Sequence, residues 1–173
     1  MADDGVLRVA RGALRFFLIA NLVAMAAFVL AILLSFGFTA VLEARLLAKY
    51  GPSLDAASVV QAMRLLMLAA FPAGAALNLI FSRLLAMVAT VRDGDPFTAA
   101  NAQRLQTIGW ALLVLQALDL LLGAFALWFT TLHVEFGTWS PSFGGWIATL
   151  MVFVLARVFR VGAAMRDDLA MTI

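Results

Sequence analysis

Four long apolar stretches decide what this chain can fold into. They run over residues 14–42, 65–91, 107–132 and 143–162, and each reaches the roughly 20 residues that a helix needs to cross a hydrocarbon core about 30 Å thick. Lipid offers no partner for unpaired backbone groups, so such stretches must be helical. With 65% apolar and 13% charged residues, the chain is also much more hydrophobic than a soluble domain, in which about 25% of the residues are charged. The sequence predicts an all-α integral membrane protein, a four-helix bundle formed by one transmembrane domain of residues 1–173.

The positions of the basic residues predict the orientation of this bundle. Cytoplasmic loops retain Lys and Arg, and with a cytoplasmic N-terminus nine basic residues fall inside and three outside. The inner set is Arg8, Arg11, Arg15, Arg83, Arg92, Arg104, Arg157, Arg160 and Arg166, and the outer set is Arg45, Lys49 and Arg64. We therefore expect both termini in the cytoplasm. The first stretch is about twice the apolar length of a secretory signal, so it is interpreted as a retained anchor.

Several kinds of chemistry find no support in the sequence. The chain has no Cys and a single His, so we expect no disulfide, no thiolate chemistry, no metal site and no cofactor. No phosphate-binding loop, dinucleotide fingerprint or nucleophile elbow is present. The net charge is only +2, and the basic residues lie beside the apolar stretches, which speaks against direct nucleic-acid binding. We expect a protein that is not an enzyme.

The most informative residue inside an apolar stretch is Asp119. A carboxylate at the centre of a membrane helix costs about 2.5–3.5 kcal/mol on insertion scales and usually faces the interior or a partner. Gln116 shares its helical face, and Asn21 and Asn78 are polar residues of neighbouring stretches. Two interpretations stay open: a proton, cation or ligand site, or a polar contact that holds helices together.

Basic side chains at the inner ends of the stretches form a second set of candidates, namely Arg83, Arg157 and Arg160. Long basic side chains of this kind can extend to the membrane interface. The alternatives are a pocket for an anionic lipid headgroup or an ion pair with Asp119. Pro72 inside the second stretch predicts a helix kink. The kink is either a purely structural feature or a hinge for gating.

The connections carry helix-start signals. Ser53 or Asp55 is expected to cap the helix that enters the second stretch. Asp95 is expected as the N-cap of the third helix, with Pro96 at its first position, and Phe97 is expected near the interface.

One of these connections also resembles a known family. The turn Gly94-Asp95-Pro96-Phe97, followed by Asn101, Arg104-Leu105 and Ile108-Gly109-Trp110, is similar to the G-x-P-F turn and N-x-x-x-L helix of the DUF2975 family of small bacterial membrane proteins. The end of the chain adds Arg157, Arg160, Gly162, Asp167-Asp168 and Thr172-Ile173 to the similarity, although Ala170 stands where many relatives have an acid. The resemblance extends over nearly the whole chain in element order. It implies a four-helix protein of the bacterial cytoplasmic (inner) membrane, often encoded beside a small helix-turn-helix repressor and without established enzymatic activity.

Three functions remain open at this point. The first is a regulatory or sensing protein whose inner surface engages a small DNA-binding repressor, with Gly94, Asp95, Pro96, Phe97, Asn101, Asp167, Asp168 and Thr172 as docking residues. The second is a channel or transporter, formed by a homo-oligomer, whose pathway is lined by Asp119, Gln116, Asn78 and Asn21. The third is a structural subunit of a larger complex, for which small residues such as Ala20, Ala24, Ala27 and Ala31 would allow close helix packing.

Overall fold

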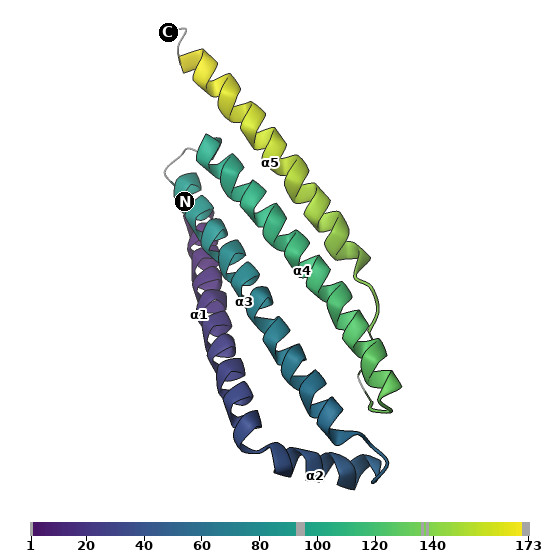
Figure 1. Cartoon of the computed structure of the whole chain (residues 1–173). Helices are drawn as coiled ribbons and strands as arrows, with labels where there is room; N and C mark the ends of the chain where they lie inside the picture. Colours follow the sequence, from purple (N-terminus) through teal and green to yellow (C-terminus); the bar gives the residue numbers. More distant parts are fainter. Residues whose placement is uncertain (1, 93–95, 136, 138, 171–173) are drawn as a thin grey trace.

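Helices make up almost all of the described chain, which in this computed structural model comprises residues 2–92, 96–135, 137 and 139–170 (Figure 1). The elements are α1 (Ala2–Gly37), α2 (Thr39–Tyr50), α3 (Ala56–Arg92), α4 (Ala99–Thr131) and α5 (Phe143–Ala170). All except α2 are long and apolar enough to cross a membrane. The prediction of an all-α fold with four helices of membrane-spanning length is confirmed.

The four long helices stand in an open row. Helix α1 packs on α3, α3 on α4 and α4 on α5, while α2 crosses the end of the α1–α3 pair (Figure 1). Within the described residues, α1 makes no helix-to-helix packing with α4 or α5, and α5 makes none with α3. Both described ends of the chain lie at the same end of the row, away from α2. The bundle is therefore open, and both faces of the central pair are left accessible to lipid or to a partner.

Two apolar clusters join α3 to its neighbours. Near the middle of α3, Ala76 and Ile80 pack against Ile108 and Ala111 of α4. Near the α2 end, Val59 and Ala62 pack against Phe129, and side chains of α2 and of the segment after α4 close around them. Each cluster pairs a small side chain with a large one, which lets neighbouring helices approach closely.

The first apolar stretch ends earlier than expected. It was predicted as one helix through residue 42, but α1 stops at Gly37, and Phe38 has non-helical dihedrals of φ −113° and ψ 25° before α2 starts at Thr39. The Ser35 carbonyl accepts a hydrogen bond from Thr39 Oγ1 at 3.0 Å and another from Arg64 Nη2 at 2.7 Å. These side chains satisfy a carbonyl at the break, so the chain can turn there without leaving it unpaired.

The start of α3 agrees with its predicted cap. Asp55 Oδ1 accepts a hydrogen bond from the Ser58 backbone N at 3.1 Å, and Asp55 Oδ2 accepts one from Ser58 Oγ at 2.5 Å. These bonds favour the ionised carboxylate, so they lower the pKa of Asp55 below its ordinary value. Of the two candidates for this cap, Asp55 is the one that acts.

The predicted cap of α4 is wrong. The helix begins at Ala99, and its N-cap is Thr98, whose side chain accepts a hydrogen bond from the Asn101 backbone N. Pro96 therefore lies outside the helix, and Asp95 itself lies outside the described residues. The hydroxyl of Thr98 thus satisfies an unpaired N–H of the first turn, the role that was predicted for the carboxylate of Asp95.

Helix α5 is displaced along α4. Gly145 in its first turn lies against Gln116, and Gly162 near its other end lies against Phe97. The start of α5 is thus level with the middle of α4, about four turns short of the end of α4 at Thr131. At the opposite end α5 continues to Ala170, beyond the predicted limit of residue 162 and past the first turn of α4 (Figure 1).

Candidate functional site

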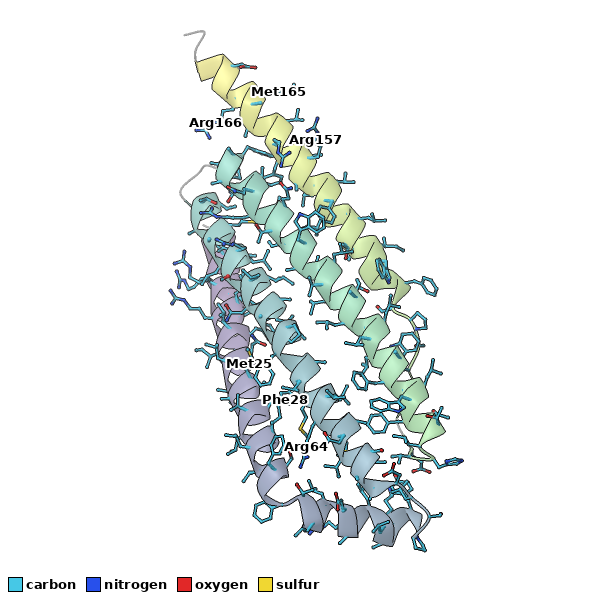
Figure 2. All side chains as sticks on the ribbon, viewed as in Figure 1. Met25, Phe28, Arg64, Arg157, Met165 and Arg166 are labelled. Carbon is cyan, nitrogen blue, oxygen red and sulfur yellow. The ribbon has the colours of Figure 1, made fainter. Side chains whose placement is uncertain are left out.

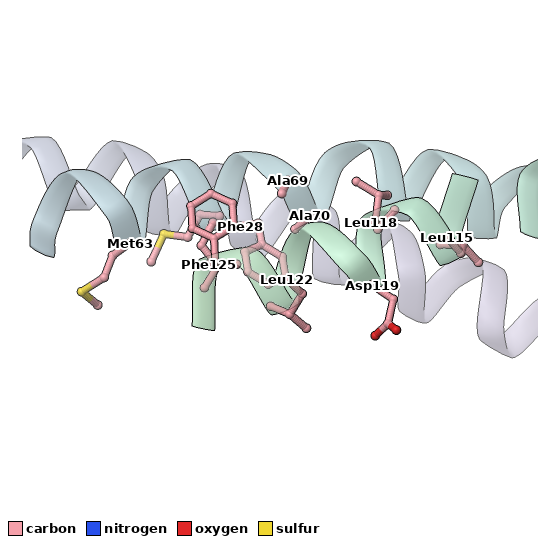
Figure 3. Close-up of a pocket in the computed structure, with 12 residues that line it drawn as sticks. Phe28, Met63, Ala69, Ala70, Leu115, Leu118, Asp119, Leu122 and Phe125 are labelled. Carbon is pink, nitrogen blue, oxygen red and sulfur yellow. The ribbon is translucent and has the colours of Figure 1, made fainter. Parts of the chain in front are cut away.

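A cavity opens on one face of α3, between α1 and α4. It has a volume of about 530 Å³, within the range of about 300–1,000 Å³ that is typical of small-molecule sites. Asp119 is its one acidic lining residue and lies toward the opposite end of the cavity from Met63 (Figure 3). The complete lining is Phe28, Met63, Leu66, Met67, Ala69, Ala70, Ala73, Leu115, Leu118, Asp119, Leu122 and Phe125. We call this cavity the Asp119 groove.

Asp119 takes its hydrogen bonds from the segment that leads into α5. Trp139 Nε1 donates to Oδ1 at 3.4 Å, and the Ser142 backbone N donates to Oδ2 at 3.5 Å. Both bonds are long, and the side chain is half-buried. No ion pair of Asp119 is found among the described residues, and Arg83 lies elsewhere, in a separate polar cavity of about 320 Å³ with Arg104. The expectation of an arginine partner for Asp119 finds no contact in the structure.

The other intramembrane polar residues do not converge on Asp119. Asn21 Nδ2 donates to the Gly74 carbonyl of α3 at 2.9 Å. Gln116 packs against Gly145 of α5, where its Oε1 is buried and has no hydrogen-bond partner among the described groups. Asn78 is half-buried on α3 and does not line the groove. The structure places these side chains at separate helix contacts instead of along one polar path.

Asn101 organises the end of the row that carries both termini. Its side chain is fully buried, and Nδ2 donates to Thr90 Oγ1 and to the Pro96 carbonyl, both at 2.8 Å. Its Oδ1 accepts a hydrogen bond from Arg104 Nη1 at 2.7 Å. One side chain thus ties the end of α3 and the connecting segment to the start of α4, which explains in physical terms why a turn with Pro96 and Phe97 is followed by an Asn.

Phe97 and the end of α5 form one surface beside this network. Phe97 packs against Phe159 at a ring-centroid distance of 4.9 Å, and its carbonyl accepts a hydrogen bond from Arg166 Nη1 at 3.4 Å. Arg160 Nη2 donates to Gln106 Oε1 at 2.6 Å. Arg157, Met165 and Arg166 are labelled on this part of α5 in Figure 2. We call the surface formed by residues 96–101 and 159–166 the terminal platform.

Part of the predicted docking set falls beyond what the structure describes. Gly94, Asp95 and Thr172 lie outside the described residues, as does the side chain of Asp167. Asp168 is exposed on the last turns of α5. Of the docking candidates, the described Pro96, Phe97 and Asn101 are brought together.

Sequence reasoning missed the most unusual charged residue. Arg64 was counted among the outer basic residues, yet only 8% of its surface is exposed, and its side chain lies between α1 and α3 near α2 (Figure 2). Its Nε donates to Ser35 Oγ at 3.1 Å, and Nη2 donates to the Ser35 carbonyl at 2.7 Å and to Thr39 Oγ1 at 2.6 Å. Its guanidinium also lies 4.1 Å from the centre of the Phe36 ring. The available signal was its position, directly between Met63 and Leu65 at the start of an apolar stretch.

Metal-ligating residues are not clustered. Among the described residues, no group of three His, Asp or Glu side chains is placed to hold a metal ion. His133 has a left-handed backbone with φ 58° in the turn after α4, and its side chain is exposed.

These observations define a class: a small helical membrane protein with an apolar groove, a buried arginine and, at its terminal end, a platform of apolar and basic side chains. The chain belongs to the DUF2975 family, described as "Protein of unknown function (DUF2975)", whose model matches residues 44–173. The match begins within α2, so α1 lies outside it, although the resemblance was expected to extend over nearly the whole chain. Searches of curated proteins and of solved structures returned no match.

Proposed function

We propose that this protein is a regulatory or sensing protein of the bacterial cytoplasmic membrane whose terminal platform engages a small cytoplasmic DNA-binding repressor. The observation that carries the proposal is the projection of α5 past the start of α4, held in place by the contacts of Phe97 with Phe159 and Arg166. A helix end that extends beyond its neighbour presents side chains to the surrounding solution.

The chemistry of the platform suits a protein partner. Phe97 is 45% exposed and Met165 is 64% exposed, while Arg160 and Arg166 add positive charge beside them. An interface typically combines an apolar centre with a polar rim, and Arg and Met are enriched in such surfaces. The platform would take an acidic and apolar face of the repressor, which leaves the basic face of the repressor for DNA.

The link between membrane and platform supports a sensing role. Helix α5 runs without interruption from the level of Asp119 to the platform, and Asn101 couples α3 and α4 at the same end. A shift of α5 along α4 in the membrane would therefore move Phe159 and Arg166 relative to Phe97. Such a rigid helix displacement is an ordinary switching motion.

Co-purification with controlled variants tests the proposal. Protein extracted gently from its native membrane should carry a stoichiometric DNA-binding protein, and Met165→Asp should abolish its recovery because a charge enters the apolar centre. Phe143→Asp is the matched control, since Phe143 is a 75% exposed residue at the opposite end of α5. The proposal would be contradicted if the wild type recovered no cytoplasmic protein and deletion of the protein left transcription unchanged.

A channel or transporter is the second candidate, and the Asp119 groove is the observation that favours it. Its lining is apolar apart from Asp119, and Gln116, Asn78 and Asn21 do not line it, so a polar pathway would need further copies of the chain. Flux across liposomes that disappears in Asp119→Asn would support this function. Absence of flux in the wild type would remove it.

A further inference from the structure

We infer that Arg64 binds the anionic headgroup of a membrane amphiphile whose acyl chain lies along α3 toward the Asp119 groove. This site is distinct from the terminal platform and does not depend on the proposed repressor. It rests on the unbalanced charge of Arg64, the cavity beside it and the apolar path that leads away from it.

No carboxylate of the described residues balances the charge of Arg64. Arg64 as a whole residue is more than nine-tenths buried, and the three hydrogen bonds of its guanidinium go to a neutral carbonyl and two hydroxyls. Among the described residues, no carboxylate forms an ion pair with it. A buried charge without a counter-charge is costly in a membrane protein, so buried arginines normally have an anionic partner.

The guanidinium also has donors to spare. Its Nε supplies one N–H and its Nη2 two, and these account for the bonds to Ser35 and Thr39. A guanidinium has five N–H donors, so the two on Nη1 remain, and no hydrogen bond of Nη1 is found among the described groups. Carboxylate and phosphate oxygens are the acceptors that this planar group binds best.

A cavity lies where such an anion would bind. It has a volume of about 220 Å³ and is walled by Arg64, Ser35 and otherwise apolar side chains of α1, α2 and α3. These are Ala31, Leu34, Phe38, Leu42, Val60, Met63 and Met67. A cavity with one cationic side chain and an otherwise apolar lining favours a ligand with an anionic headgroup and an apolar chain.

The apolar path continues from this cavity into the Asp119 groove. Met63 and Met67 line both spaces, and Phe28 of α1 lines the groove farther along the same face. Figure 2 shows Arg64, Phe28 and Met25 following one another between α1 and α3. Methionine side chains adapt to irregular partners, which suits a wall for a flexible acyl chain.

Native mass spectrometry of the purified protein tests headgroup selection. With phosphatidylglycerol and phosphatidylcholine of equal chain length in competition, we expect the wild type to prefer the anionic lipid and Arg64→Met to lose that preference by about tenfold, as for one charge-assisted contact. Arg64→Lys should retain part of it. Arg45→Met is the matched control, since Arg45 is an exposed arginine of α2 outside the cavity, and its preference should stay unchanged. Equal binding of the two lipids by the wild type, or a full preference in Arg64→Met, would overturn the inference.

Two further measurements guard against a variant that merely misfolds. Ala31→Phe fills the cavity and leaves Arg64 in place, so it should also lose the preference while its melting temperature without lipid stays near that of the wild type. Decyl phosphate should raise the melting temperature of the wild type, whereas inorganic phosphate at the same concentration should not. An equal rise with inorganic phosphate would contradict the acyl-chain path.

Discussion

Asn101 shows how much of this fold can depend on a single polar side chain. Its amide is fully buried and makes three hydrogen bonds, to Thr90, Pro96 and Arg104. Removing it would take one hydrogen bond each from the half-buried Thr90 hydroxyl, Pro96 carbonyl and Arg104 guanidinium. Such groups cost about 1–3 kcal/mol each when they are desolvated and unpaired.

We therefore expect Asn101→Ala to destabilise the protein by about 2 kcal/mol or more, with α4 loosened from α3 at its first turn. Thermal unfolding in detergent, followed by circular dichroism, measures this as a lower melting temperature. Gln103→Ala changes an exposed amide two residues away and should leave the melting temperature almost unchanged. Equal melting temperatures for Asn101→Ala and the wild type would show that the network contributes little.

Among the helices, α4 and α5 approach each other very closely at Gly145 and Gln116. A side chain at Gly145 would collide with the amide group of Gln116, whereas one at the adjacent Gly144 would meet nothing within 4 Å. This contact between Gly145 and Gln116 fixes how far α5 is displaced along α4. Small residues at such contacts let backbones approach and make packing in lipid favourable.

Gly145→Ala should accordingly lower the melting temperature, because either Gln116 or the whole of α5 has to shift. The added change Gln116→Ala should restore most of the loss by freeing the space. Gly144→Ala is the control and should be neutral or stabilising by up to about 1 kcal/mol, since Ala favours helix over Gly. A double variant as unstable as Gly145→Ala alone would contradict the collision.

The long helices could be predicted from the sequence, but the contacts between them could not. Apolar length alone identified four helices of spanning length, and residue type narrowed the cap of α3 to Ser53 or Asp55, of which Asp55 forms the hydrogen bonds. The end of α1 at Gly37 was missed because it depends on Arg64, which lies 29 residues away from Ser35 along the chain. The pattern of apolar residues does not predict a hydrogen bond between residues so far apart in the sequence.

The same limit applies to the candidate sites. Asp119 stood out because a carboxylate is rare in an apolar stretch, yet its partners Trp139 and Ser142 depend on the displacement of α5. Gln116 and Asn21 were correctly singled out as polar residues, but their different neighbours, Gly145 and Gly74, separate them from Asp119. Residue type identified the unusual side chains, and only helix packing decided which of them meet.

For the molecule as a whole, the positions of the basic residues predict which end faces the cytoplasm. The sequence contains no Cys, so single cysteines can be introduced without background. We expect Ser53→Cys and His133→Cys, both exposed positions in the turns that follow α2 and α4, to react with an impermeant maleimide in intact cells. Ala164→Cys should react only after the membrane is opened. The reverse pattern would overturn the orientation that the nine inner arginines predict.

The displacement of α5 gives the two edges of the row unequal apolar heights. The uncharged run of α1, residues 16–37, covers 22 residues and that of α5, residues 143–156, covers 14, or about 33 Å and 21 Å of helix at 1.5 Å per residue. A bilayer of uniform thickness can match only one of these edges without distortion, and each ångström of hydrophobic mismatch costs a fraction of a kcal/mol. The bilayer therefore has to be thinner beside α5 than beside α1. The tilt of the row consequently depends on the hydrophobic thickness of the surrounding membrane.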